Sequence, residues 1–94
     1  MKWRVFHVIH PTFGFGTDPV WPTGYIEVVR LSAENAEDVF RVTNTIDSPW
    51  WKGNKGFFFL VLPPLRSTSV GDVAVDADGR VFRFEMVGVT EVTV

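Results

Sequence analysis

Short apolar runs separated by turn residues dominate the first third of the chain. Residues 3–9 are β-branched and aromatic and lead to Pro11, which predicts a strand that ends before a residue unable to donate to a sheet. Residues 10–24 are rich in proline and glycine and predict a loop with apolar anchors. Residues 25–31 predict a second strand that delivers the chain to a helix.

Residues 33–45 predict a helix with one apolar stripe. Ser32 is placed to act as the N-cap, because its hydroxyl can accept a backbone N–H of the first turn. Glu37 and Arg41 are spaced to form an ion pair on the polar face. The stripe recurs at helical spacing and consists of Ala36, Val39, Phe40 and Thr43. We expect this stripe to pack on a sheet.

Residues 57–62 form an unbroken apolar run between a glycine and two prolines. A run of this length and composition is typical of a strand buried on both faces, so it predicts the central strand of the sheet. We expect this segment to be the heart of the core.

The pattern of apolar and polar residues changes near residue 70. Asp78-Gly79 lies between residues 73–75 and the alternating run 80–86, which predicts a hairpin because glycine can adopt the positive φ of a tight turn. Residues 89–94 are a candidate last strand. The alternation predicts that three side chains face inward: Phe82, Phe84 and Met86.

These elements predict an α+β fold of order ββαβββ, in which one helix packs on a largely antiparallel, twisted sheet. With 94 residues, of which 46% are hydrophobic, the chain is expected to fold as a single domain spanning residues 1–94. It has no cysteine, which excludes a disulfide framework and a thiolate nucleophile and favours a reducing compartment. No signal peptide or membrane span is recognisable, so we expect a cytoplasmic protein that has no membrane partner.

Candidate catalytic chemistry is sparse. His7 and His10 are the only histidines, and their spacing across the end of a strand does not direct two rings at one metal, so neither a metal nor another cofactor is expected. Residues 66–73 place serines near Asp72, which raises the alternative of a small hydrolase or nuclease. No catalytic base accompanies them in the sequence, and a turn-forming role explains these residues better.

Residues 47–56 carry the most informative pattern. Trp50 and Trp51 are adjacent, and two neighbouring indoles in a loop do not both point inward by simple geometry, although both could cover the end of the core. An exposed indole suits a protein interface or stacking on a base. The net charge is -2, but residues 48–71 carry +3. The three positive residues are Lys52, Lys55 and Arg66.

Two strings are distinctive: Thr-Asn-x-Ile-Asp-x-Pro-Trp-Trp at residues 43–51 and Arg-Ser-x-Ser-Val-Gly-Asp-Val at residues 66–73. On these strings, the chain resembles a group of small proteins encoded by actinobacterial phages and other mobile elements, some described as YodL-like. The resemblance covers residues 36–51 and 66–92 and implies origin more than activity. Thr45 stands where the group often has histidine. The matched polar and aromatic positions are Asn44, Asp47, Trp50, Trp51, Arg66, Ser69 and Asp72.

The residues predict a non-enzymatic accessory or regulatory protein, and the resemblance implies that it is a phage protein acting in the cytoplasm of a bacterial host cell. It would bind a host or phage protein through aromatic loops around Trp21, Trp50 and Trp51. The alternative is weak nucleic-acid binding by residues 48–71, where three cations could neutralise only about three phosphates. A homodimer is a further expectation, because the last strand would leave an open sheet edge.

Overall fold

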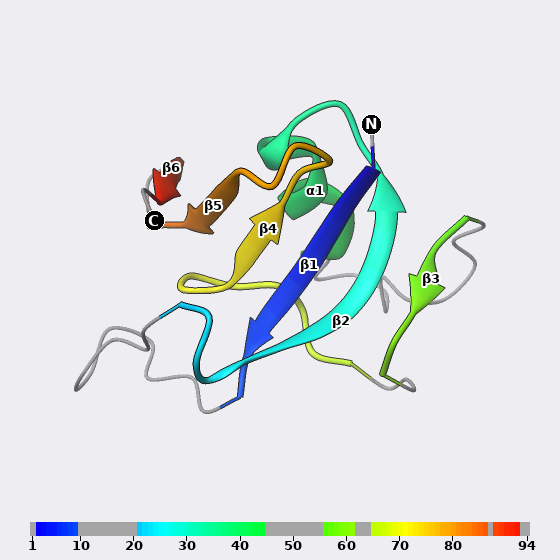
Figure 1. Cartoon of the computed structure of the whole chain (residues 1–94), viewed down its shortest axis with the longest axis horizontal. Helices are drawn as coiled ribbons and strands as arrows, with labels where there is room; N and C mark the ends of the chain where they lie inside the picture. The colour runs from blue at the N-terminus through cyan, green and yellow to red at the C-terminus, as the bar shows by residue number, and fades with distance from the viewer. Residues whose placement is uncertain (1, 10–20, 45–55, 62–64, 87, 93–94) are drawn as a thin grey trace.

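The computed structural model describes residues 2–9, 21–44, 56–61, 65–86 and 88–92. Figure 1 shows the order of the elements along the chain. They are β1 (Lys2–Val8), β2 (Tyr25–Ser32), α1 (Ala36–Thr43), β3 (Phe58–Phe59), β4 (Val73–Val75), β5 (Val81–Phe84) and β6 (Val89–Val92).

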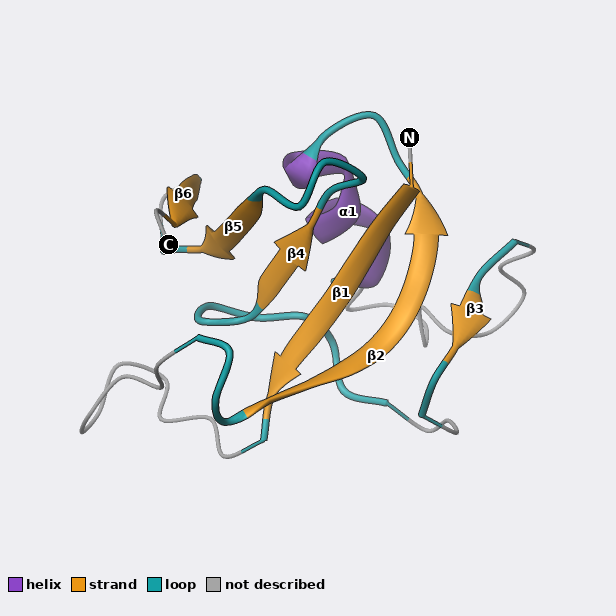
Figure 2. Cartoon of the chain, in the orientation of Figure 1, coloured by secondary structure: helices purple, strands orange, loops and turns teal. Residues whose placement is uncertain are grey.

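The strands form one antiparallel sheet in the order β3-β2-β1-β4-β5-β6. Figure 2 shows α1 against one face of this sheet. The predicted α+β class is confirmed in its broad form, since the described residues contain one helix and six strands and are mostly β. The predicted order has three strands after the helix, whereas the described residues contain four.

Cross-strand pairing sorts the side chains into two faces, because directly paired residues of an antiparallel sheet point to the same side. One row of partners on the helix side is Phe59, Val29, Val5, Ala74, Phe82 and Glu91. The neighbouring row on the opposite side, which we call the outer face, is Phe58, Arg30, Arg4, Val75, Val81 and Val92.

The main core lies between the sheet and α1. Its fully buried members include Val5, Val29 and Leu31 of the sheet and Val39 of the helix. The Trp3 indole also lies in this core, where its N–H donates to the carbonyl of Ala33 at 3.1 Å. This bond ties the connection between β2 and α1 to the start of β1.

A smaller cluster occupies the outer face at the β4–β5 side of the sheet. Val73, Val75 and Val81 are buried there. The side chains of Phe6, Trp21, Tyr25 and Val92 pack against them. The outer face is therefore covered by side chains on one half, while the half near β2 and β3 carries Arg4, Arg30 and Phe58.

The prediction that residues 57–62 form a central strand buried on both faces is wrong. Among the described residues of this run, 57–61, the strand comprises Phe58 and Phe59, and β3 lies at the end of the sheet, beside β2. The Phe58 side of this strand faces outward, and the residue is 64% exposed. The centre of the sheet is instead the pair β1 and β4, both flanked by strands on each side.

The helix is shorter than predicted and begins later. Ser32 belongs to β2, so the prediction that it caps the helix is wrong. Asn35 is the N-cap, and its side-chain oxygen accepts a hydrogen bond of 2.8 Å from the Asp38 amide. Arg41 pairs with Asp38 instead of Glu37. The predicted stripe is confirmed: its buried or half-buried members are Ala36, Val39, Phe40 and Thr43.

The hairpin between β4 and β5 is confirmed. Gly79 adopts a φ of 86°, and its amide donates to the carbonyl of Asp76 at 3.1 Å. The carboxylate of Asp76 also accepts the amides of Asp78 and Arg80, so this side chain organises the turn. The expectation that Met86 faces the core is wrong, because the alternation ends at Phe84 and Met86 is 89% exposed.

Across the described ranges, the structure contains no helix that is both long enough and apolar enough to cross a membrane.

Candidate functional site

Residues 65–72 fold against the end of β1 and build a polar cluster, which we define as His7, Arg66, Thr68, Ser69 and Asp72. Asp72 is fully buried and lies at its centre. The Arg66 guanidinium donates to both oxygens of Asp72, at 2.6 and 2.7 Å. The amide of Ser69 donates to the same carboxylate at 2.7 Å, which closes a turn.

The ion pair of Arg66 and Asp72 also bonds the backbone of Val8. The Val8 amide donates to Asp72 Oδ1 at 2.9 Å, and the Val8 carbonyl accepts from Arg66 at 3.2 Å. Two side chains thus satisfy both backbone groups of the last residue of β1, in the way that a neighbouring strand would. The distinctive string at residues 66–73 therefore has a structural role.

The described residues of the two distinctive strings contact each other. Thr68 donates its amide to the carbonyl of Thr43 at 2.9 Å, and the Asn44 side chain donates to the carbonyl of Thr68 at 2.5 Å. Both residues at the end of α1 belong to the first string, whereas Thr68 lies within the second. The contact fixes the C-terminal end of the helix to the polar cluster.

His7 is a buried member of this cluster and is 4% exposed. A hydrogen bond of 2.9 Å joins its Nε2 to the hydroxyl of Thr68. Burial lowers the pKa of His7 to about 4, because an imidazolium loses hydration there; Asp72 acts in the opposite direction and Arg66 in the same one. The imidazole is therefore neutral near pH 7.

The described contacts of the cluster combine the residue types of a hydrolase without the geometry of a catalytic triad. In a catalytic triad, the hydroxyl and the carboxylate contact different nitrogens of the histidine. Here Thr68 and Asp72 both face Nε2, the carboxylate at 4.0 Å, and Asp72 is held by Arg66 instead. Thr68 is also fully buried, which leaves a substrate no access to its hydroxyl. The arrangement stabilises the fold and is unsuited to nucleophilic attack.

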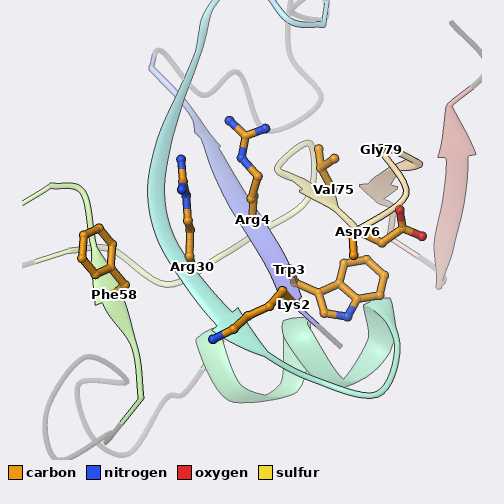
Figure 3. Close-up of a pocket in the computed structure, with 9 residues that line it drawn as sticks. Lys2, Trp3, Arg4, Arg30, Phe58, Val75, Asp76 and Gly79 are labelled. Atoms are coloured by element: carbon orange, nitrogen blue, oxygen red, sulfur yellow. The ribbon is translucent and has the colours of Figure 1, made fainter.

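A separate feature lies on the outer face, where a groove of about 600 Å³ crosses the start of β1. We call it the basic groove and define it by Lys2, Arg4, Arg30 and Phe58, with the β4–β5 turn as its far wall. Figure 3 shows Arg4 and Arg30 extending side by side, with Phe58 on one flank and Gly79 on the other. Its volume lies within the range of small-ligand sites.

Arg4 and Arg30 are direct cross-strand partners, and two like charges in this position repel each other. Glu27 relieves the repulsion, since its carboxylate contacts Arg4 at 2.8 Å and Arg30 at 2.6 Å. Burial opposes ionisation of Glu27, but the hydrogen bonds from the two arginines outweigh this and hold its pKa below the usual range. Glu27 is thus a stable negative bridge between two cations.

A β-bulge makes this bridge geometrically feasible. The pairing shifts between Val5–Val29 and Phe6–Glu27, so Val28 is an extra residue in β2. Side chains two apart share a face of a regular strand, and the extra residue brings Glu27 and Arg30, three apart, to the same face.

Two of the six binding residues predicted from the sequence, Trp21 and Arg66, lie in the described part of the chain. Trp21 is half-buried in the outer cluster, where its ring packs edge-on against Phe6 and Tyr25 with centroids 4.8 and 5.2 Å apart. Arg66 is engaged by Asp72. The other four predicted residues lie outside the described part of the chain: Trp50, Trp51, Lys52 and Lys55. His10 also lies outside it.

Sequence reasoning missed the basic groove. Its defining residues come from β1, β2 and β3, and the sequence alone does not reveal that Arg4 and Arg30 are partners. Polar and apolar residues alternate only over residues 2–5, which is a weak signal for an outward-facing cation at Arg4, and the bulge in β2 hides the relation between Glu27 and Arg30.

Within the residues that the structure describes, no three histidine, aspartate or glutamate side chains are grouped to hold a metal ion. Comparison of the chain with models of known protein families, with curated proteins and with solved structures found no match.

Proposed function

We propose that this protein is a non-enzymatic accessory protein of a phage or mobile element that acts by binding another protein. The observation that carries the proposal is the exposure of large apolar side chains at the β3 end of the sheet. Phe58 is 64% exposed and Leu60 is 43% exposed. Leu60 follows Phe58 by two residues, and its amide donates to the carbonyl of Val28 at 2.9 Å, so both residues lie beside β2.

Placing such side chains in water is unfavourable, by about 25 cal/mol for each Å² of apolar surface. Single exposed apolar residues are common, but neighbouring ones beside a groove are typical of interaction sites. Aromatic residues are also enriched among those that dominate binding energy at protein interfaces. Trp50 and Trp51 precede β3 in the sequence, and we include them in the proposed contact surface.

The structure lends less support to the alternative of nucleic-acid binding by residues 48–71. Arg66, one of its three cations, is bound to Asp72 and to the Val8 carbonyl, so phosphate binding would have to break these bonds. A small hydrolase is also less favoured, since the polar cluster lacks triad geometry.

The test is affinity purification of the tagged protein from the cells in which it occurs. We expect Phe58→Ser combined with Leu60→Ser to lose a partner that the unmodified protein retains. Met86→Ser is the matched control, because Met86 is even more exposed but lies beyond β5, away from β3. The proposal fails if the double variant retains every partner, or if the control loses the same one.

A further inference from the structure

We infer that the basic groove binds an acidic, extended segment of the partner protein, with carboxylates on Arg4 and Arg30 and an apolar side chain against Phe58. The inference rests on the proposed protein-binding function and names the chemistry of the partner. It starts from the charge of the groove, which is opposite to that of the chain.

The groove combines three cations with two carboxylates. Lys2, Arg4 and Arg30 contribute +3, and Glu27 with Asp76 contributes -2, which leaves +1 on a chain whose net charge is -2. An approaching acidic segment is therefore attracted to this part of the surface more than to the rest of the protein.

The arginines are positioned before any ligand arrives. Glu27 accepts from one terminal nitrogen of Arg4 and from Nε of Arg30, which fixes both side chains. Each guanidinium has five N–H donors, so further donors are left for a second acceptor. The side chains of Arg4 and Arg30 are 48% and 49% exposed. Planar guanidinium groups bind carboxylates by paired hydrogen bonds, which suits aspartate or glutamate.

Phe58 supplies an apolar contact at the side of this charged site. It is the direct cross-strand partner of Arg30, so its ring and the guanidinium lie on one face. A segment that alternates acidic and apolar residues would therefore satisfy the groove, because its carboxylates and its apolar side chains would meet different parts of it.

A single-stranded nucleic acid fits the groove less well. Such strands bind where several cations neutralise successive phosphates and several aromatic rings stack on bases. Here the net charge is small, Phe6 is packed against Trp21, and Phe58 is the exposed ring of the groove. The observations favour a peptide.

The direct test is fluorescence anisotropy with defined probes at low salt. The probes are a labelled Glu-Leu repeat peptide, a Gln-Leu repeat of equal length and oligothymidine. We expect the Glu-Leu peptide to bind roughly tenfold more tightly than the Gln-Leu peptide, as one charge-assisted pair would give. Equal binding of the two peptides, or tighter binding of oligothymidine, would overturn the inference.

Variants of the groove provide the second arm. The triple variant Arg4→Gln, Glu27→Gln and Arg30→Gln removes the charges without leaving a carboxylate unpaired, and we expect it to lose the preference for Glu-Leu. Glu27→Gln alone should increase affinity several-fold, because it removes a competing carboxylate. Arg41→Gln on the helix is the matched control and should change nothing. Unchanged binding by the triple variant contradicts the inference.

The two proposals fail in different ways. If the triple variant retains the cellular partner that Phe58→Ser with Leu60→Ser loses, protein binding stands and the acidic ligand is wrong. If the serine double variant also retains every partner, the proposed function itself is wrong.

Discussion

The Val8 amide at the end of β1 donates to the Asp72 carboxylate at 2.9 Å, although the two residues are far apart in the sequence. The same carboxylate accepts both contacts from Arg66. The buried side chain of Asp72 therefore joins the end of the central strand β1 to the turn that precedes β4. Its removal should lower the stability of the fold.

We expect Asp72→Asn to lower the free energy of unfolding by about 3 kcal/mol, because it leaves the guanidinium of Arg66 beside a neutral group in a largely buried site. Chemical denaturation measures the change. Asp78→Asn, in the exposed β4–β5 turn, is the control and should stay within about 0.5 kcal/mol. A similar effect of both substitutions would contradict the structural role of Asp72.

The burial of His7 predicts a pH dependence of stability. Its pKa is about 4 in the folded chain against 6.5 for a histidine in water, so between these pH values the unfolded chain binds a proton that the folded chain does not. Stability is therefore full above pH 6.5 and falls as the pH decreases towards 4, by about 3 kcal/mol from this group.

Denaturation at pH 7 and near pH 4 should reveal this loss. His7→Gln keeps a side chain able to bond Thr68 but does not titrate, so its stability should depend less on pH over the same interval. Identical pH profiles for the two proteins would show that His7 is not responsible.

The position of β3 predicts unequal effects of neighbouring phenylalanines. Phe58→Ala should change the free energy of unfolding by less than about 1 kcal/mol, because most of its ring is already in water. Phe59→Ala should cost about 2 kcal/mol, since Phe59 packs against the main core. Thermal or chemical denaturation distinguishes the two. A central strand buried on both faces would instead give two large losses.

The helix start can be tested by two substitutions. Asn35→Ala removes the acceptor of the Asp38 amide and should lower stability by about 1 kcal/mol. Ser32→Ala should have little effect, because Ser32 is an exposed residue of β2. The reverse ranking would mean that the helix begins at Ser32.

Local pattern predicted much of this fold. Periodicity identified the buried stripe of α1, and Asp78-Gly79 identified the β4–β5 hairpin, because both signals depend on residues close in sequence. Residues 57–62 were wrongly predicted to form a central strand, because an apolar run reflects composition and does not show how many strands lie beside it. β3 has one described neighbour in the sheet, and its Phe58 side chain lies on the part of the outer face that is not covered, where it is exposed to solvent.

The candidate sites were harder to predict, for a physical reason. The basic groove requires the register of three strands and a bulge in β2, which are properties of long-range pairing. Residues 69–72 form a turn, as the sequence predicts, but the bonds from residues 66–73 to Val8 and His7 join segments that no local pattern relates. The predicted contact residues Trp50 and Trp51 stay predictions.

The central place of β1 has a consequence for how the chain acquires its structure. β1 and β2 are consecutive along the chain, as are β4 and β5, so each of these pairs can form locally. β1 and β4 pair through three residue pairs, although most of the sequence separates them. Closing so large a loop costs more entropy than forming a local hairpin. We therefore expect the β1–β2 and β4–β5 pairs to form early and to associate with each other late. The bonds of Asp72 to Val8 and Arg66 would then form last and stabilise the pairing of β1 with β4.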